Sequence, residues 1–324
     1  MSTVRGRWAP TPSGLLHVGN AAAALAAWLS CRAQGGTFLW RIEDLDPPRV
    51  VPGAAEAALA DLAWLGLDWD EGPDAGPFAP YRQSQRSACY ENALDRLAAA
   101  GRLFPCRLSR ADLAAIATAP HGPGGDGPPY PASLRPRELP DDWLARVRAG
   151  ELGAASLRFQ VAPGALTFED RVWGRRTERV GEAVGDFVLR RRDGLWAYQL
   201  AVVVDDLAMG VTEVVRGRDL LGSTARQIQL IEALGGERPV YAHLPLVVNA
   251  GGEKLSKRDA ALTLASLRQA GVSPQRLTGY LAFALGLLDA PEPCHPAELV
   301  ASFSWKRVKR EDHRLPGDLA TKLG

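Results

Sequence analysis

Two groups of residues, far apart in the sequence, could bind a chain of phosphates. The first is near the start, where "RWAPTPSGLLHVGN" ends in His17, Gly19 and Asn20 just before an apolar helix. Free backbone N–H groups and the helix dipole favour an anion at such an N-terminus. Gly19 allows a ligand to approach the backbone, His17 can donate to a phosphate oxygen, and Asn20 can cap the helix or contact the ligand. Taken alone, the segment fits an ordinary buried turn equally well.

The second group is the loop "GGEKLSKR", which carries Lys254, Lys257 and Arg258. Clustered cationic groups on a loop can stabilise a triphosphate while its charge redistributes during displacement. A short basic run is more often only a solvated face. The two groups together therefore indicate a site for a triphosphate, and neither is specific alone.

The elements that must position these groups are predicted from periodicity and turn residues. A helix is expected over 21–32, with Asn20 as its N-cap and a stop at Gly35-Gly36. A strand in "TFLWRIED" and helices over 54–65 and 84–100 follow. Strand, helix and strand with short connections are typical of a doubly wound α/β unit.

The second half of the chain has a different pattern. Short antiparallel strands are expected over 156–180, and "DFVLRRRDGLWAYQLAVVVDD" predicts a hairpin that turns at Asp193-Gly194. A strand in "GVTEVVRG", a helix over 223–235 and helices up to about Gly286 follow. These patterns indicate an α/β domain that is split by a small insertion and followed by a mainly helical segment.

Composition narrows the possible classes of function. The 324 residues are 46% hydrophobic and 23% charged, and the net charge of +1 gives no global signal for nucleic acid. Contact with RNA would need local patches such as "RVWGRRTERV", Arg190 to Arg192 or "WKRVKR".

Four scattered cysteines indicate reduced thiols in a cytoplasmic protein. The opening apolar stretch is short and broken by Pro and Gly, so neither a membrane span nor a signal peptide is expected.

The two phosphate-binding segments resemble the HIGH and KMSKS signatures of class I aminoacyl-tRNA synthetases. The resemblance narrows to the glutamyl branch, because eight segments occur in that family's order: "RWAPTPSGLLHVGNA", "RIEDLD", "LGLDWDEGP", "YRQSQR", "YQLAVVVDD", "EVVRGRDLL", "HLPLVVN" and "KLSKR". This resemblance covers nearly the whole chain. It implies an α/β fold: a Rossmann-type class I catalytic domain with an inserted small α+β acceptor-type subdomain and a mainly helical C-terminal region like a stem-contact region.

The resemblance also implies a division of the chain. The two halves of the Rossmann catalytic domain are expected over 1–103 and 186–250, with the inserted subdomain over 104–185 between them. The KLSKR loop and the helical stem-contact-like region are expected over 251–324.

Only 66 residues follow Arg258 (324 minus 258), which leaves little room for the anticodon-binding domain of glutamyl-tRNA synthetases. A shortened chain with "IEDLDPPRVVPGAAE" resembles the glutamyl-queuosine tRNA(Asp) synthetases. That family activates L-glutamate with ATP without needing tRNA, then attaches it to the queuosine base in the anticodon of tRNA(Asp). Two alternatives stay open: a compact glutamyl-tRNA synthetase that charges tRNA(Glu), and a catalytically silent RNA-binding paralogue.

Site residues follow from the resemblance, position by position. Those expected at the glutamate are Arg7, Ala9, Thr11, Ser13, Glu43, Tyr198 and Arg216, and those expected at ATP are His17, Gly19, Asn20, Lys254 and Lys257. Glu43 is expected to accept from the α-ammonium group, and Arg216 to pair with the side-chain carboxylate, which a guanidinium fork matches. Asp205 and Asp206 are expected to hold the framework of the site. Mg²⁺ is expected with ATP, and the protein is expected to be a monomer.

The chain departs from this branch at the zinc site that many members carry in the insertion. Their pattern is Cys-x-Cys followed by Tyr-x3-Cys. Cys106 and Tyr130 match it, but Leu108 and Leu134 stand at the other two positions. One thiolate and one phenol cannot make a four-ligand structural site. We therefore expect no zinc, with apolar packing in its place.

Overall fold

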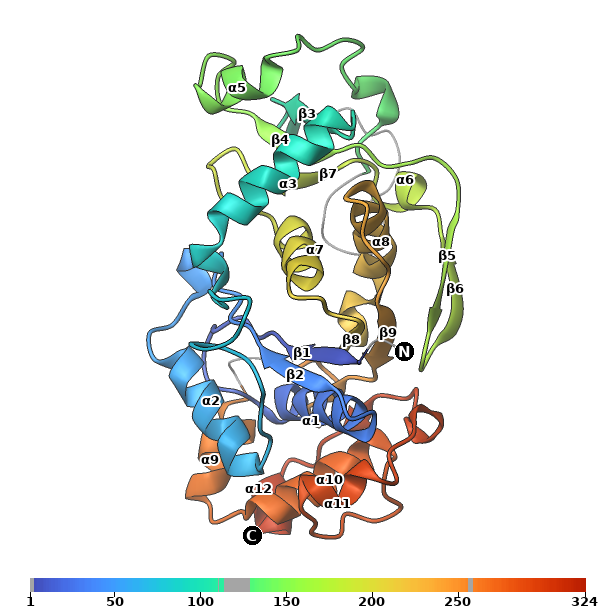
Figure 1. Ribbon diagram of the computed structural model, residues 1–324. Helices are drawn as coiled ribbons and strands as arrows, with labels where there is room; N and C mark the ends of the chain where they lie inside the picture. Colours follow the sequence, from blue (N-terminus) through green and yellow to red (C-terminus); the bar gives the residue numbers. More distant parts are fainter. Residues whose placement is uncertain (1–2, 110, 114–128, 256–258) are drawn as a thin grey trace.

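Four strands form the parallel centre of the molecule, two from each half of the chain (Figure 1). The computed structural model describes residues 3–109, 111–113, 129–255 and 259–324. The first parallel pair is β1 (Arg5–Trp8) with β2 (Thr37–Trp40), and the second is β8 (Glu213–Gly217) with β9 (Val240–Leu244). The Thr212 N–H donates to the Arg5 carbonyl oxygen at 3.0 Å, which joins the two pairs. Ligands of such sheets bind outside the carboxyl ends of the strands.

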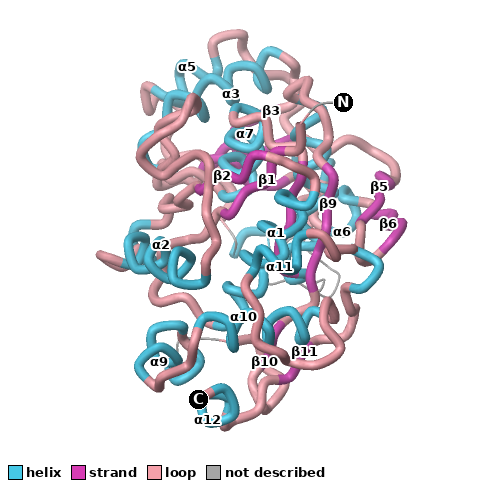
Figure 2. The backbone as a smooth tube through the Cα atoms, turned by 60° about the horizontal axis from the view of Figure 1, so that its bottom comes forward, coloured by secondary structure: helices cyan, strands magenta, loops and turns pink. Residues whose placement is uncertain are grey.

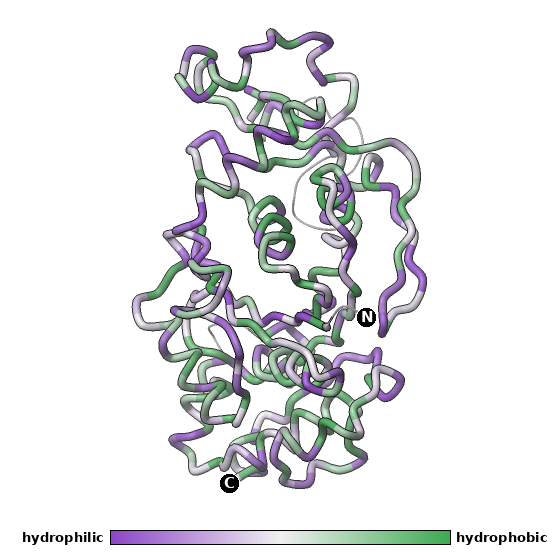
Figure 3. Tube along the Cα trace, in the orientation of Figure 1, coloured by the Kyte–Doolittle hydropathy of each residue, from purple (hydrophilic) through white to green (hydrophobic). Residues whose placement is uncertain are grey.

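Helix α1 (Val18–Ala33) connects β1 to β2, and eleven of its sixteen residues are buried. It is nearly apolar all round because it packs between the strands and the C-terminal helices α10 (Pro274–Leu285) and α11 (Pro296–Val300). Most of its trace is green in Figure 3. The helix begins three residues earlier than expected, so the prediction of Asn20 as N-cap is wrong. His17 holds that position instead.

The predicted hairpin after 186 is correct in its first strand and turn and wrong in its second strand. Strand β7 (Phe187–Arg190) and the turn at Asp193-Gly194 are present, but the chain then forms helix α7 (Tyr198–Ala208). All residues from Leu200 to Asp206 are buried, against α3 and α8 among others. Burial on several sides therefore outweighs the strand preference of its three consecutive valines.

Other helices follow their predictions more closely. Helix α2 (Ala54–Leu65) has the expected bounds, and α8 (Thr224–Ala233) lies inside its expected range. Helix α3 (Ser87–Ala99) begins later than expected, because the N–H and hydroxyl of Ser84 donate to the Asp44 carboxylate instead of capping the helix.

A small antiparallel sheet in the order β3, β4, β7 lies toward one end of the molecule, with the short helix α5 above it in Figure 1. Their bounds are β3 (Leu103–Cys106), β4 (Ser156–Phe159) and α5 (Trp143–Arg148). The hairpin β5 (Leu166–Asp170) and β6 (Gly174–Glu178), followed by α6 (Val180–Ala183), confirms the short antiparallel strands expected here. Its strand β5 joins β9, with Asp170 opposite Tyr241.

The positions of the family's zinc ligands lie in a small apolar cluster of this region. Cys106 and Tyr130 are buried in it together with Phe104 and Leu113, and the partly buried Leu108 and Leu134 pack against it. The residues present therefore do not fit a zinc ion: two of the four donor positions carry aliphatic side chains. Among the described residues, no group of three His, Cys, Asp or Glu side chains could hold a metal ion.

In the described residues of the C-terminal part, most of the regular structure is helical, as predicted, and turns and loops connect the helices. This part holds α9 (Leu264–Gln269), α10, α11, α12 (Leu319–Leu323) and the parallel pair β10 (Val247–Val248) and β11 (His313–Arg314). Figure 2 shows α9, α10, α12 and this pair at one end of the molecule. In the part of the chain that is described, no helix is both long and apolar enough to cross a bilayer.

The apolar interior is divided at the central strands. One large cluster contains α1 and the C-terminal helices, and a second contains α3, α7, α8 and the small antiparallel sheet. In β2, Phe38 and Trp40 belong to the first cluster while Leu39 belongs to the second. The side chains of this strand thus serve two cores, as expected for a parallel strand buried on both faces.

Candidate active site

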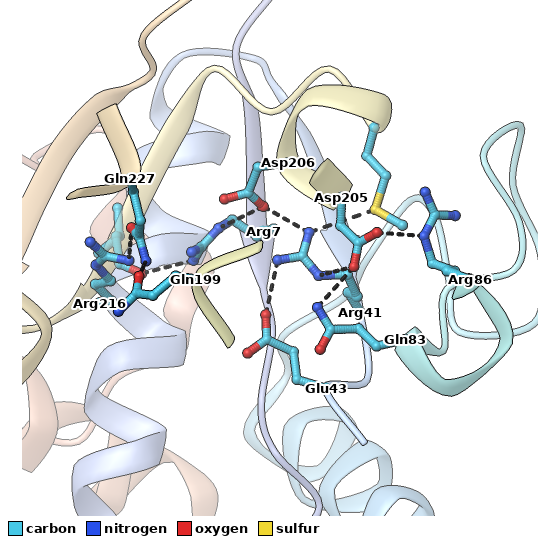
Figure 4. Close-up of polar contacts among 12 residues, drawn as sticks. Arg7, Arg41, Glu43, Gln83, Arg86, Gln199, Asp205, Asp206, Arg216 and Gln227 are labelled. Atoms are coloured by element: carbon cyan, nitrogen blue, oxygen red, sulfur yellow. Dashed lines mark hydrogen bonds and ion pairs between the residues drawn. The ribbon is translucent and has the colours of Figure 1, made fainter. Parts of the chain in front are cut away.

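A network of buried ion pairs lies beyond the carboxyl ends of β1 and β2, where α7 approaches them (Figure 4). Arg41 is 0% exposed; its Nη1 donates to Asp206 Oδ1 at 2.7 Å and its Nη2 to Glu43 Oε1 at 3.0 Å. The Nε atom of Arg7 lies 3.5 Å from the same Asp206 oxygen. Burial raises the pKa of Asp206, but Arg41 and Arg7 outweigh it and the net shift is downward. Asp206 is therefore an anion that holds both guanidinium groups in place.

The neighbouring carboxylate, Asp205, lies 3.9 Å from Arg41 Nε and ties α7 to the segment before α3 (Figure 4). It is fully buried and accepts hydrogen bonds from Arg86 Nε at 2.6 Å, Gln83 Nε2 at 2.8 Å and the Tyr90 hydroxyl at 2.9 Å. Both aspartates thus bind groups of the protein itself. This agrees with the framework role expected for them.

Glu43 is 8% exposed and lies three residues beyond the end of β2. Its backbone N–H donates to the Pro10 carbonyl oxygen at 3.0 Å, which fixes it beside the loop that follows β1. Burial raises the pKa of its carboxyl, against the opposing effect of Arg41 and Arg7. A buried carboxylate of this kind can accept hydrogen bonds from an ammonium group.

Arg216, at the end of β8, is 6% exposed and is held by three neutral acceptors. They are His243 Nε2 at 2.9 Å, Gln227 Oε1 at 2.8 Å and Thr224 Oγ1 at 3.0 Å. Among the described residues, none of its hydrogen-bond partners is a carboxylate. A buried cation without a direct anionic partner is costly, and an anionic ligand would relieve that cost.

Tyr198 is influenced by both parts of the site, the carboxylate of Glu43 and the guanidinium of Arg216. Burial raises the pKa of its phenol, and the charged groups that act on it include Arg216, Glu43 and Arg7. Arg7, Glu43 and Arg216, three other residues predicted at the glutamate and each from a separate segment, are therefore close enough for their charges to act on the Tyr198 phenol. Ala9, Thr11 and Ser13 are half-buried in the loop after β1. Their contact with a substrate stays a prediction.

His17 and Asn20 form a reciprocal cap at the N-terminus of α1. The Asn20 N–H donates to His17 Nδ1 at 3.2 Å, and the His17 N–H donates to Asn20 Oδ1 at 3.1 Å. Because Nδ1 accepts, the proton of the neutral imidazole is on Nε2, which can donate to a phosphate. A Cβ atom on Gly19 would lie 3.2 Å from the imidazole ring, so the glycine leaves room for it.

The segment just after the KLSKR loop meets this helix N-terminus. The Leu264 N–H donates to the Leu16 carbonyl oxygen at 2.9 Å, just after the loop. Burial, and then the positive charge of Lys254, lower the pKa of His17 to about 4. Lys254 itself is ion-paired with Asp219. Lys257, also predicted at ATP, lies outside the described residues.

The sequence reasoning missed three groups of the site. Arg41 follows an apolar strand directly, and a charged residue among buried ones signals a paired interior charge. His243 and Thr224, which hold Arg216, carry no comparable signal, because the pairing of β8 with β9 brings His243 beside it and the start of α8 brings Thr224 there.

Three comparisons place this geometry among known proteins. Residues 3–312 match the family described as tRNA synthetases class I (E and Q), catalytic domain. The chain is 52% identical over 319 residues to the glutamyl-Q tRNA(Asp) synthetase of Symbiobacterium thermophilum, covering 98% of both chains. It is 45% identical over 321 residues to that of Nitratidesulfovibrio vulgaris, covering 99% of this chain and 98% of the other.

Among solved structures, a glutamate tRNA ligase from Elizabethkingia meningosepticum in complex with its amino acid superimposes with a TM-score of 0.85 at 30% identity. The match covers 99% of this chain and 69% of that one. The expected fold, a class I synthetase catalytic domain, is thereby confirmed. The chain belongs to the glutamyl-Q tRNA(Asp) synthetase family of class I tRNA synthetases.

Proposed function

We propose that this protein activates L-glutamate with ATP, without needing tRNA, and transfers it to the queuosine base in the anticodon of tRNA(Asp). The observation that carries the proposal is the 52% identity, over 98% of both chains, to a relative with this name. The site supports it as well, because it offers a buried cation and a buried carboxylate to one small ligand.

In this proposal the glutamate spans the site between the two buried groups of opposite charge. The side-chain carboxylate pairs with Arg216, and the α-ammonium group donates to Glu43, with Tyr198 between them. Arg7, Ala9, Thr11 and Ser13 line the remaining wall. The α-carboxylate is then left free to attack the α-phosphorus of ATP in line. No general base is required, since the nucleophile is already ionised.

The ATP phosphates lie at the N-terminus of α1 in this proposal. The neutral His17 donates from Nε2, Gly19 lets the phosphates reach the backbone, and Asn20 maintains the cap that holds the ring. Lys254 and Lys257 neutralise the charge of the departing pyrophosphate. Mg²⁺ carried on the triphosphate would neutralise further charge.

Isotope exchange between pyrophosphate and ATP tests the first half of this function. We expect exchange that requires L-glutamate and proceeds without tRNA. Arg216→Leu removes the cation and is expected to abolish exchange, whereas Arg175→Leu, at an exposed position on β6, leaves it unchanged. Absence of glutamate-dependent exchange in the wild type would favour the silent paralogue.

The acceptor is tested with labelled glutamate and tRNA(Asp) with and without queuosine. We expect label only on queuosine-containing tRNA(Asp), and we expect it to survive periodate oxidation of the 3′ ribose before the reaction. Charging of tRNA(Glu) at its 3′ end would instead support the compact glutamyl-tRNA synthetase.

We further propose that the protein acts as a monomer in the cytoplasm, where its tRNA substrate is found. We also keep the proposed division at 1–103, 104–185, 186–250 and 251–324. Sedimentation equilibrium at several concentrations tests the first point, because a monomer keeps one mass of about 34.8 kDa.

A further inference from the structure

Three buried side chains on neighbouring strands form a line behind the predicted glutamate site. Asp170 ends β5, His243 lies in β9 and Arg216 lies in β8. Asp170 Oδ2 lies 2.6 Å from His243 Nδ1, and His243 Nε2 accepts from Arg216 Nε at 2.9 Å. Their exposed fractions are 4%, 0% and 6%. No step of the proposed mechanism uses Asp170 or His243.

The chemistry of arginine fixes where the protons lie in this line. A guanidinium N–H can only donate, so His243 Nε2 must accept and carries no proton. The proton of the imidazole is therefore on Nδ1, where it donates to Asp170. Burial lowers the pKa of His243, and the charge of Arg216 acts in the same direction. The imidazole is a neutral link between an anion and a cation.

Asp170 is itself fixed by the turn after β5. Its Oδ1 accepts from the backbone N–H groups of Val172 at 3.0 Å and Trp173 at 2.9 Å. The indole N–H of Trp173 donates to the His243 carbonyl oxygen at 2.8 Å, which joins the turn to β9. One carboxylate oxygen is thus held by the backbone, and the other is aimed at the imidazole.

The result of this arrangement is visible at Arg216. A guanidinium has five N–H groups, and three of those of Arg216 donate to His243, Gln227 and Thr224. The two that remain belong one to each terminal nitrogen. Two N–H groups on the two terminal nitrogens can bind a carboxylate in the bidentate manner when both face it.

We propose that Asp170 and His243 are positioning residues for glutamate recognition: Asp170 fixes the tautomer of His243, and His243 fixes the rotation of the Arg216 guanidinium, so that its two remaining N–H groups face the side-chain carboxylate. This inference rests on the proposed function, because it assigns a purpose to groups that act through Arg216.

Asp170→Asn is the sharpest test, since an amide offers one acceptor where the carboxylate offers two. The backbone N–H groups of Val172 and Trp173 claim the amide oxygen, so its NH₂ group faces His243 Nδ1. The imidazole proton then moves to Nε2, where it faces the Nε–H of Arg216, so the hydrogen bond between these two nitrogens is lost. We expect the KM for glutamate to rise roughly 10- to 100-fold, the range of one lost hydrogen bond to a charged group. The KM for ATP should stay unchanged.

A second pair of variants tests His243 independently. His243→Leu removes the acceptor, whereas His243→Gln keeps an amide oxygen that can accept from Arg216. We expect the Gln variant to recover part of the glutamate affinity that the Leu variant loses. Nitrogen-15 shifts of labelled histidine should assign the Nδ1–H tautomer in the wild type and the Nε2–H tautomer in Asp170→Asn.

The matched control is Asp186→Asn in the antiparallel sheet region. Asp186 is equally buried and also accepts from a backbone N–H, that of Val161, but it pairs with Arg135. Its substitution is expected to lower the melting temperature without changing the KM for glutamate. No glutamate-dependent exchange in the wild type would contradict the proposed function. The positioning role would be overturned if the wild type is active and Asp170→Asn keeps the wild-type KM for glutamate or the wild-type tautomer of His243. It would also be overturned if Asp170→Asn raises the KM for glutamate and the KM for ATP equally.

Discussion

His17 has two ring nitrogens, and the fold uses one of them for structure and leaves the other for a ligand. Nδ1 caps α1, so the residue predicted to face ATP also determines where the helix begins. The sequence indicated a helix start and a phosphate site here, but assigned the cap to Asn20. Both residues can cap a helix, and only the backbone path decides which one does.

At the scale of this residue, we predict that His17 titrates with a pKa near 4, well below the ordinary 6.5. Between these two values the unfolded chain takes up a proton that the native protein does not. The free energy of unfolding should therefore decrease as the pH falls from about 6.5 to about 4. NMR titration and urea unfolding at several pH values measure both effects.

His17→Asn is the control, because asparagine keeps a capping acceptor and removes the titration. Lys254→Met should raise the pKa of His17, since the ammonium charge is the second cause of the shift. A midpoint near 6.5 in the wild type would contradict the burial argument.

At the scale of elements, the periodicity of the sequence predicted α1, α2 and α8 well and α7 not at all. The first three carry alanine or a clear helical pattern, and Gly residues end them. In α7 the valines suggest a strand, and only the surrounding helices reveal that the segment is buried as a helix. The same limit applies to the site: motifs located Arg7, Glu43 and Arg216, but cross-strand neighbours such as His243 depend on sheet pairing.

The two adjacent aspartates of α7 link this helix to the segments around Arg41 and Arg86, and this link can be tested. Asp205→Ala leaves the buried Arg86 without its carboxylate and unpairs Gln83 and Tyr90. We expect a loss of about 3–5 kcal/mol in unfolding free energy, the range for breaking a buried ion pair. Urea denaturation measures it.

Asp68→Ala is the comparison on the surface. Asp68 is also paired with an arginine, but its side chain is 73% exposed. We expect this variant to lose no more than about 1 kcal/mol. Equal losses in the two variants would contradict the assigned difference in burial.

The ion pair of Lys254 with Asp219 predicts a competition at the KLSKR loop. A lysine that serves the triphosphate must leave this carboxylate, and exposed pairs are worth about 0.2–1 kcal/mol. We therefore expect Asp219→Asn to lower the KM for ATP by roughly 1.5- to 5-fold. Steady-state exchange kinetics at saturating glutamate test this, and a rise in KM would show that Asp219 assists ATP binding instead.

At the scale of the whole molecule, the insertion holds an apolar cluster at the positions where the family resemblance implies a zinc site. Leu108 and Leu134 pack against the cluster that contains Cys106 and Tyr130. The sequence predicted apolar packing at these positions, because both carry leucine.

We predict that the purified wild type contains no stoichiometric zinc and that Leu108→Cys with Leu134→Cys restores binding. The double variant rebuilds the family's set of three thiolates and one phenol. Metal analysis after dialysis against zinc measures both proteins, and each single variant is the control. Stoichiometric zinc in the wild type would show that other groups of this chain serve as ligands.

The neutral partners of Arg216 also bear on fidelity. Glutamate and glutamine have almost the same shape, so a pocket that measured volume alone would accept both. Three uncharged acceptors hold the guanidinium but do not neutralise it. The side-chain amide of a bound glutamine would leave the buried positive charge of Arg216 uncompensated, whereas the carboxylate of glutamate would cancel it. If glutamate binds as proposed, we therefore expect charge to decide the selection between these two amino acids.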